Sequence, residues 1–172
     1  GDHRDLHLSL RRQRQMCIRD RKTTAIVILN DTNGNLDAVI MGVGTGGTLT
    51  GVSKILKKKN KKIKIIAVEP EDSPILSGGA AGPHKIQGIG AGFIPKILNK
   101  KSIDEVIQIA NETAFSTARM AAKVEGLPIG ISSGAALAAG IEVAQRKEMK
   151  NKKIVVVIPS FAERYLSTAL FN

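Results

Sequence analysis

An apolar run of strand length, residues 36–41, leads directly into the glycine-rich segment Gly-Val-Gly-Thr-Gly-Gly-Thr at 42–48. After it, Val52, Ile55 and Leu56 recur at helical spacing. In a strand, glycine turn and helix joined in this order, the first N–H groups of the helix are free to bind a phosphate. The order therefore predicts an α/β fold with an anion site at residues 42–48.

The same alternation of apolar runs and helical patterns continues along the chain, whereas residues 71–95 are rich in Gly and Pro and are expected to form a long loop. The expected strands are 36–41, 63–69, 103–110 and 153–159, and the later expected helices are 112–125, capped by Asn111, and an alanine-rich helix that follows residues 132–134 and ends near residue 147. Alternating strands and helices predict a three-layer, doubly wound α/β domain with a mostly parallel sheet.

Composition excludes several classes of protein. The apolar runs fall far short of the roughly 20 residues that a membrane span needs. The formal net charge is +11, but aromatic residues make up only 3% and the lysine-rich run 57–62 fits a solvated helix end, so no nucleic-acid partner is expected. Cys17 is the only cysteine, which rules out an intramolecular disulfide and favours a cytoplasmic setting.

Basic residues are distributed unevenly. Six of the nine arginines lie in the first 21 residues, whereas lysine dominates afterwards. This change predicts a boundary near residue 22. Residues 1–22 are interpreted as a non-native or disordered leader, and residues 23–172 as the α/β domain.

The glycine segment has more than one interpretation. Gly42, Gly44 and Gly47 fit the dinucleotide pattern G-x-G-x-x-G, and Glu69 ends the next expected strand, where a ribose-binding acid belongs. The neighbouring threonine hydroxyls instead suit a compact phosphate monoester. A tight turn without any ligand is the third interpretation.

Four segments together resemble the cysteine synthase, or O-acetylserine sulfhydrylase, family of pyridoxal-phosphate enzymes. They are GVGTGGTLTG at 42–51, GPHKIQGIGAGFIP at 82–95, GISSGAA at 130–136 and PSFAERYLSTALF at 159–171. Their order and spacing match from about residue 23 onward. The resemblance implies fold type II, in which this chain supplies the larger, cofactor-binding part of a tryptophan-synthase-β-like fold.

The resemblance implies pyridoxal 5'-phosphate as the cofactor and assigns residues to its site. The phosphate loop corresponds to Gly44, Thr45, Gly46, Gly47 and Thr48. Ser132 corresponds to the serine that faces the pyridine nitrogen. The loop beside the substrate cleft corresponds to Gly88, Ile89, Gly90 and Ala91. No metal site is implied.

The implied reaction is β-replacement, in which O-acetyl-L-serine and sulfide give L-cysteine and acetate. The family's Schiff-base lysine lies in a motif that does not occur here, so no residue of this chain is assigned a catalytic role and the isolated chain is expected to be inactive. The family also implies a homodimer and a partner, the C-terminal tail of serine acetyltransferase. Related lyases such as cystathionine β-synthase share the phosphate loop and stay open as alternatives.

Three further side chains have both a structural and a functional interpretation. His84 is expected to make a loop-ordering hydrogen bond rather than act as a base. Tyr165 is expected to pack rather than react, and Ser133 is expected to cap a helix rather than bind a ligand.

Overall fold

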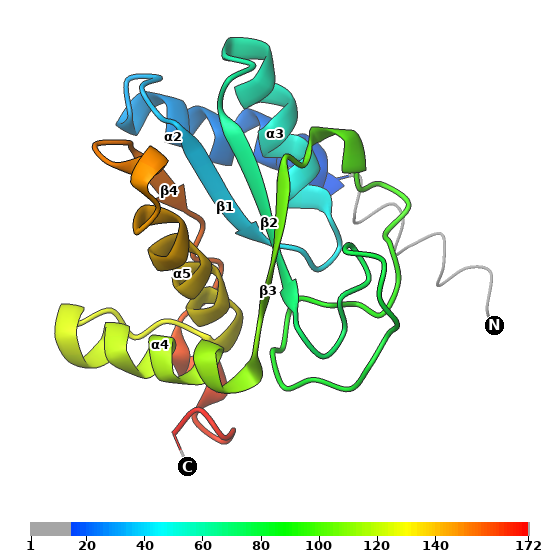
Figure 1. Cartoon of the computed structure of the whole chain (residues 1–172), viewed down its shortest axis with the longest axis vertical. Helices are drawn as coiled ribbons and strands as arrows, with labels where there is room; N and C mark the ends of the chain where they lie inside the picture. Colours follow the sequence, from blue (N-terminus) through cyan, green and yellow to red (C-terminus); the bar gives the residue numbers. More distant parts are fainter. Residues whose placement is uncertain (1–14, 172) are drawn as a thin grey trace.

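The computed structural model describes residues 15–171 and contains one sheet of four parallel strands (Figure 1). The strands are β1 (Ala38–Gly42), β2 (Lys64–Pro70), β3 (Glu105–Ile109) and β4 (Ile154–Val156), in the order β3-β2-β1-β4. Ile40 of β1 lies opposite Ile66 of β2 and Val156 of β4. Because all strands run the same way, the loops at their carboxyl ends gather at one edge of the sheet.

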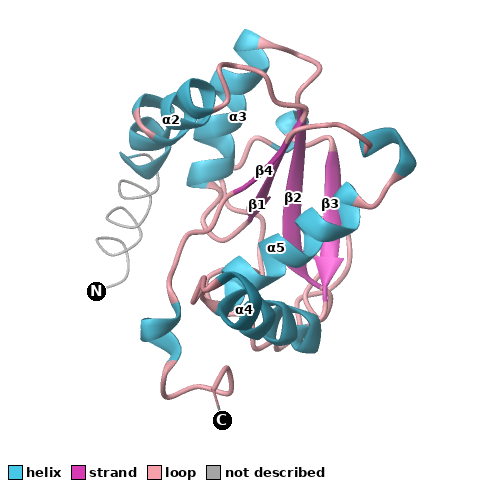
Figure 2. Ribbon diagram, turned by 90° about the vertical axis from the view of Figure 1, so that its left-hand side faces the viewer, coloured by secondary structure: helices cyan, strands magenta, loops and turns pink. Residues whose placement is uncertain are grey.

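Helices cover both faces of this sheet (Figure 2). Helices α2 (Thr24–Asp31) and α3 (Gly47–Lys59) cover one face, and α4 (Asn111–Glu125) and α5 (Ile131–Ala144) cover the other. Short 3-10 turns follow at Lys100–Ser102 (η1), Lys147–Met149 (η2) and Ala162–Tyr165 (η3). The predicted three-layer, doubly wound α/β fold is confirmed.

Successive residues of the central strands point into two different cores. Val39 and Met41 pack with α2 and α3, whereas Ile40 packs with α4 and α5. All three are fully buried or nearly so. Such continuous apolar strands are typical of parallel sheets covered on both faces.

Helices α4 and α5 lie unusually close because small residues meet at their contact. A Cβ added to Gly134 would overlap the carbonyl oxygen of Ala114 and lie 2.8 Å from the Ala118 methyl group. Helix α4 then ends at Gly126, which adopts a left-handed φ of 66°. The two predicted alanine-rich helices are therefore present, and Gly134 allows their close contact.

Both predicted helix caps are wrong. Ala110, not Asn111, is the N-cap of α4, and no side chain caps that helix. The Asn111 amide instead donates to Asp72 Oδ2 and accepts a hydrogen bond from Lys85 N. Gly130 is the N-cap of α5, which places Ser133 inside the first turn.

Three of the four predicted strands were too long, and one helix was not predicted. Strand β4 spans three residues rather than the seven predicted at 153–159. Residues 24–31, for which no element was predicted, form α2, whose buried residues are Ala25 and Ile28. The long loop is confirmed, because the described chain has no helix or strand between Pro70 and η1.

The predicted leader, residues 1–22, is only partly described, since residues 1–14 lie outside the described residues. Residues 15–22 are helical and pack against α3, where a Cβ on Gly51 would lie 2.6 Å from the Cys17 carbonyl oxygen. Asp20 is 5% exposed and accepts a hydrogen bond from Thr24 Oγ1 at 2.8 Å. The boundary near residue 22 stays a prediction.

Candidate cofactor and substrate site

The predicted site residues lie at the carboxyl end of the sheet, where three loop segments and the start of a helix meet. The glycine loop joins β1 to α3, the segment 71–99 follows β2, residues 157–161 follow β4, and α5 begins nearby (Figure 1). In open α/β sheets, ligands bind in the crevice at this edge.

The glycine loop leaves a row of backbone N–H groups open. Within the described chain, the N–H groups of Gly44, Thr45, Gly46, Thr48 and Leu49 have no hydrogen-bond acceptor. Gly47 N reaches only Thr45 Oγ1, at a long 3.5 Å, and the first intrahelical bond of α3 runs from Thr50 N to Gly46 O. Open amides at a helix start, joined by the positive end of the helix dipole, fit a phosphate group.

Gly46 gives the loop its shape. It is the N-cap of α3 and adopts φ +76°, a left-handed conformation that disfavours other residues. A Cβ at this position would also lie 2.9 Å from Leu98 Cβ. The absence of a side chain therefore serves both the backbone turn and the close approach of the neighbouring loop.

The structure brings together the phosphate loop, the cleft loop at 88–91 and Ser132. A Cβ added to Gly44 would overlap the Gly88 carbonyl oxygen, and one added to Gly42 would lie 2.7 Å from Ile89 Cγ2. A Cβ on Gly88 would lie 3.3 Å from Ser132 Oγ. Backbone thus meets backbone between Gly44 and Gly88, which only glycine permits.

The two consecutive serines at the start of α5 differ in their contacts. Ser133 is fully buried, and its hydroxyl donates to Ser160 O at 3.1 Å and accepts from Ser160 N at 3.3 Å. Ser132 is 4% exposed, yet its hydroxyl makes no hydrogen bond to any other residue that the structure describes. Ser133 is therefore a structural tie, and Ser132 Oγ is available to a ligand.

One carboxylate beside the phosphate loop was not anticipated. Thr48 Oγ1 donates to Asp20 Oδ2 at 2.8 Å, so a predicted phosphate-binding hydroxyl is engaged by an acidic residue. This contact could not be predicted, because Asp20 lies in the segment interpreted as a leader.

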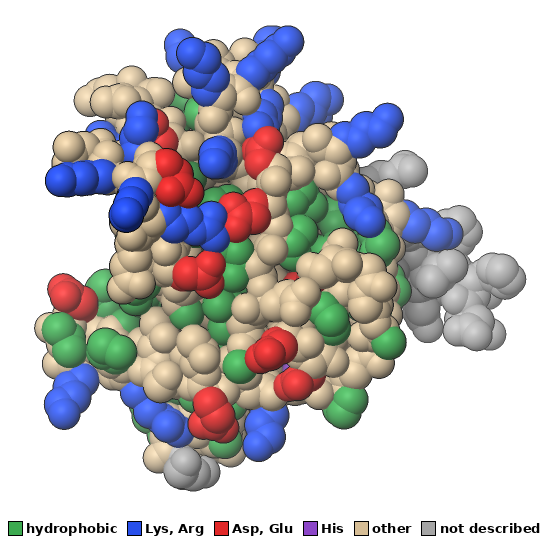
Figure 3. Space-filling model, viewed as in Figure 1, with side chains coloured by type: hydrophobic (Ala, Val, Ile, Leu, Met, Phe, Trp, Pro, Cys, Tyr) green, Lys and Arg blue, Asp and Glu red, His purple; other side chains and the backbone are tan. Residues whose placement is uncertain are grey.

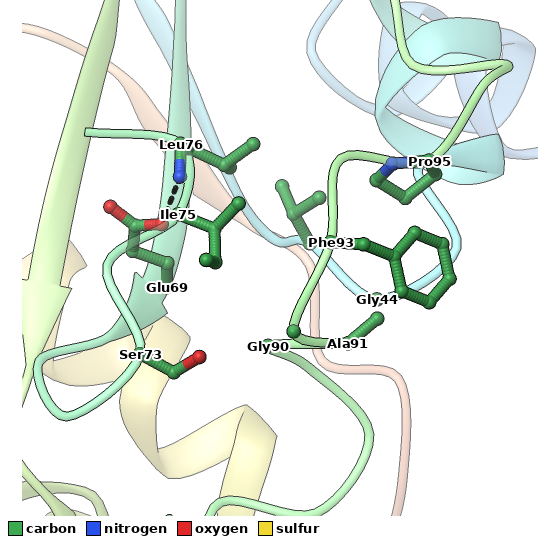
Figure 4. Close-up of a pocket in the computed structure, with 11 residues that line it drawn as sticks. Gly44, Glu69, Ser73, Ile75, Leu76, Gly90, Ala91, Phe93 and Pro95 are labelled. Atoms are coloured by element: carbon green, nitrogen blue, oxygen red, sulfur yellow. Dashed lines mark hydrogen bonds between the residues drawn. The ribbon is translucent and has the colours of Figure 1, made fainter. Parts of the chain in front are cut away.

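A small pocket lies between the phosphate loop and the segment after β2 (Figure 4). Its wall includes Gly44, Glu69, Ser73, Gly90 and Phe93. It has room for the centre of one water molecule, about 10 Å³. The Ser73 hydroxyl is buried and has no hydrogen-bond partner among the described residues.

Glu69, the acid expected to bind a ribose in the dinucleotide interpretation, is hydrogen-bonded within the chain. Glu69 is 2% exposed, and its carboxylate accepts hydrogen bonds from Leu76 N at 2.7 Å, Ser77 N at 3.1 Å and Ser77 Oγ at 2.6 Å. Figure 4 shows the Glu69–Leu76 bond. Since this carboxylate is hydrogen-bonded to Leu76 and Ser77 of the following loop, it is not free to bind a ribose hydroxyl.

The expectations for His84 and Tyr165 are confirmed. His84 Nε2 lies 2.8 Å from Gly90 O, which is a loop-ordering hydrogen bond. Tyr165 is 8% exposed and packs in the core with α4 and α5, and its hydroxyl lies 3.2 Å from Ser160 Oγ.

Displaced pKa values belong to the opposite, amino-terminal end of the sheet. The hydrogen bonds from Arg146 lower the pKa of Glu105, and they raise the pKa of Arg146 itself. The backbone hydrogen bond from Lys153 lowers the pKa of Asp37. Among residues 15–171, no group of three or more His, Cys, Asp or Glu side chains is arranged to hold a metal ion.

Comparison with known proteins identifies the family of this site. A family model described as pyridoxal-phosphate dependent enzyme matches residues 14–160. Cysteine synthase from Buchnera aphidicola (subsp. Acyrthosiphon pisum, strain APS) is 53% identical over 158 residues, which cover 87% of this chain and 50% of that protein. The chain therefore spans about half the length of the curated relatives it matches.

Solved structures show the same likeness. The crystal structure of cysteine synthase from Entamoeba histolytica has a TM-score of 0.89 and 50% identity, covering 91% of this chain and 46% of that one. The O-acetylserine dependent cystathionine beta-synthase from Helicobacter pylori has a TM-score of 0.85 and 39% identity, covering 91% and 51%. No helix in the described part of the chain has the length and apolarity to cross a membrane.

Proposed function

The chain belongs to the pyridoxal-phosphate-dependent enzymes, and from that premise we propose that it forms the cofactor-phosphate-binding part of a cysteine synthase. The proposed reaction replaces the acetate of O-acetyl-L-serine with sulfide and yields L-cysteine. The observation that carries the proposal is the row of open N–H groups from Gly44 to Leu49 at the start of α3.

These amides would hold the phosphate group of the cofactor by hydrogen bonds and by the dipole of α3. Ser132 Oγ would face the pyridine nitrogen as a neutral hydroxyl rather than a carboxylate. Bound pyridoxal phosphate supplies the electron sink for removal of the α-proton and loss of the acetate. With the neutral Ser132 hydroxyl as its partner, the pyridine nitrogen would stay largely unprotonated and the cofactor would withdraw electrons only moderately. This suits elimination and replacement at the β-carbon.

The cleft loop would shape the substrate side. Gly88 and Gly90 lack side chains, so the peptide backbone can lie against a small amino acid. The lysine that forms the Schiff base is assigned to no residue of this chain, because no lysine here has the neighbours of the family's motif.

The assembly and setting are part of the proposal. We propose a homodimer for the complete enzyme, with the C-terminal tail of serine acetyltransferase as a partner at the cleft. We also propose a cytoplasmic setting, since Cys17 has no second cysteine to pair with. Residues 1–22 remain proposed as a leader to the domain at 23–172.

The binding part of the proposal is tested by equilibrium dialysis of the chain against pyridoxal phosphate, with inorganic phosphate and NAD as competitors. We expect pyridoxal phosphate to bind, inorganic phosphate to displace it and NAD to have no effect. Displacement by NAD alone would contradict the proposal.

The catalytic part is tested by supplying the purified chain with O-acetyl-L-serine, sulfide and the cofactor. We expect no L-cysteine, because the Schiff-base lysine is not assigned here. Sulfide-dependent cysteine formation by this chain alone would overturn that assignment.

A second candidate is an O-acetylserine-dependent cystathionine synthase, favoured by the similarity to the Helicobacter pylori enzyme over 91% of the chain. The two candidates differ in the nucleophile that replaces acetate. In a complete enzyme carrying this domain, faster turnover with a thiol amino acid than with sulfide would favour the second.

A further inference from the structure

Both backbone hydrogen bonds of the cleft loop, residues 88–91, are made by Gly90. The N–H of Gly90 donates to Val43 O at 3.0 Å, and the carbonyl of Gly90 accepts a hydrogen bond from His84 Nε2 at 2.8 Å. No other backbone group of this loop is hydrogen-bonded to a residue between 15 and 171. The backbone hydrogen bonds that hold the loop therefore all lie at Gly90, beside the core packing of Ile89.

The His84 ring is fixed in one orientation and one tautomer. A carbonyl oxygen only accepts hydrogen bonds, so Nε2 must carry the proton. His84 Nδ1 is buried and has no partner in the described chain. Nε2 therefore donates to the Gly90 carbonyl, whereas Nδ1 has no hydrogen-bond partner in the described chain.

The space around Gly90 is closed by the ring. A Cβ added to Gly90 would lie 2.6 Å from His84 Nε2 and 2.5 Å from Pro70 Cγ, and Gly90 adopts φ +66°. His84 and the end of β2 thus pack directly on the Gly90 backbone.

His84 is itself anchored to a rigid element. The next residue, Lys85, donates its N–H to Asn111 Oδ1 at 2.8 Å, and the Asn111 amide also binds Asp72. Asn111 is the first residue of α4. Hydrogen bonds therefore link the start of α4, through His84 and Gly90, to Val43, which precedes the phosphate-loop residue Gly44.

We propose that His84 is a positioning residue that holds the cleft loop at a fixed distance from the phosphate loop and Ser132. Its Nε2–H fixes the Gly90 carbonyl, and this keeps Gly88 in contact with Gly44 and Ser132. The statement that a small amino acid occupies the cleft rests on the proposed function, whereas the hydrogen bond itself does not.

Three substitutions at His84 separate the donor from the rest of the ring. In His84→Gln the side-chain nitrogen lies as many bonds from Cα as Nε2 does, whereas in His84→Asn it takes the place of Nδ1. His84→Ala removes both. Lys85→Ala is the matched control, because that side chain is exposed and forms no hydrogen bond within the described chain.

The measurements are amide hydrogen exchange of Gly90 by NMR and the ¹⁵N spectrum of the histidine rings. We expect the Nε2–H tautomer for His84 in the unsubstituted chain. The Ala and Asn variants should speed exchange at Gly90 by about 5- to 10-fold, as expected for loss of one hydrogen bond. The Gln variant and the Lys85→Ala control should stay within about 2-fold, with the amides of β1 and β2 unchanged throughout.

Several results would overturn the proposal. They are an Nδ1–H tautomer, a Gln variant that exchanges as fast as the Ala variant, or equal rates in all variants. Faster exchange across the whole sheet would show a general loss of stability instead of a positioning role. Failure of pyridoxal phosphate to bind would defeat the proposed function but leave these NMR results unaffected.

Discussion

The two ends of the sheet differ in whether their polar groups have hydrogen-bond partners within the chain. At the amino-terminal end, Asp104 accepts hydrogen bonds from Ile65 N at 2.7 Å and from Lys57, and Glu105 forms a two-pronged pair with Arg146. At the carboxyl end, the N–H groups of Gly44, Thr45, Gly46, Thr48 and Leu49 and the Ser132 hydroxyl have no partner among the described residues. Lysines crowd the end where α3 finishes (Figure 3).

This difference separates folding from binding. The carboxylates of Asp37, Asp104 and Glu105 at the amino-terminal end are paired within the chain, so they contribute to stability and leave little to offer a ligand. At the carboxyl end, unpaired donors meet the requirement for an anion. A substitution at one end should therefore change stability alone, and one at the other should change binding most.

The largest effect should come from Gly46→Asp. A side chain here meets Leu98, the left-handed backbone disfavours it, and its charge repels a phosphate. We expect the affinity for pyridoxal phosphate to fall by about 100-fold or more, equal to about 2.7 kcal/mol. Equilibrium dialysis measures it.

Gly78→Asp is the matched control for this substitution. Gly78 also has a left-handed φ, +90°, but a Cβ there would meet nothing within 4 Å. The control should lose about 1 kcal/mol of stability and no affinity. An unchanged affinity in Gly46→Asp would contradict the assignment of the phosphate loop.

Ser132→Ala and Ser133→Ala lie in the same helix turn but should change different quantities, the first the ligand affinity and the second the stability. Ser133→Ala removes two hydrogen bonds to Ser160 and should lower the free energy of unfolding by about 1–2 kcal/mol. Ser132→Ala removes no bond between described residues, so stability should change by less than about 0.5 kcal/mol. Its affinity for pyridoxal phosphate should fall instead, by about 3- to 10-fold. Denaturant titration together with dialysis checks both, and the reverse pattern would contradict the roles given to the two serines.

Glu105→Gln should weaken the amino-terminal end alone. Arg146 lowers the pKa of Glu105 below its ordinary value of about 4.3. The pair therefore contributes its full stability above that ordinary value and loses it as pH falls through the lowered pKa. We expect a loss of about 1 kcal/mol at pH 7, a smaller loss below pH 4 and unchanged phosphate affinity. Urea unfolding at several pH values is the test, and a loss independent of pH would argue against the ion pair.

The smallest effect should come from Asp20→Asn. Asp20 accepts a hydrogen bond from Thr48, so its carboxylate is the exception at an end that otherwise suits anions. Removing the charge while keeping an acceptor oxygen should raise the affinity for inorganic phosphate by about threefold. Isothermal titration at low ionic strength gives the value. A decrease would show that the carboxylate supports the loop rather than opposing the anion.

The fold could be predicted from the sequence because its signals are local. Residues 36–41 and 63–69 are apolar runs of strand length, and each is bounded by turn residues or glycine. The ends were less certain, as with β4, because a strand ends where its neighbour ceases to pair. Helix α2 escaped prediction because its sequence, TAIVILND, is rich in β-branched residues and helical only in its packed setting.

The candidate site was predictable in its glycines and less so in its side-chain contacts. A positive φ or a close backbone approach restricts a position to glycine, so Gly46 and Gly88 are visible in the sequence. Contacts between distant segments leave no such trace. The tie between Ser133 and Ser160 and the pairing of Asp20 with Thr48 depend on how loops meet in space.

The segment between β2 and η1 consists of turns, and its order depends on a few hydrogen bonds such as those of Glu69 and His84. Few of its residues contribute to the two cores beneath the helices. Apart from the glycines in close contact, side chains in this stretch can therefore be exchanged with little disturbance of either core, so the rim of the site can change while the interior stays the same.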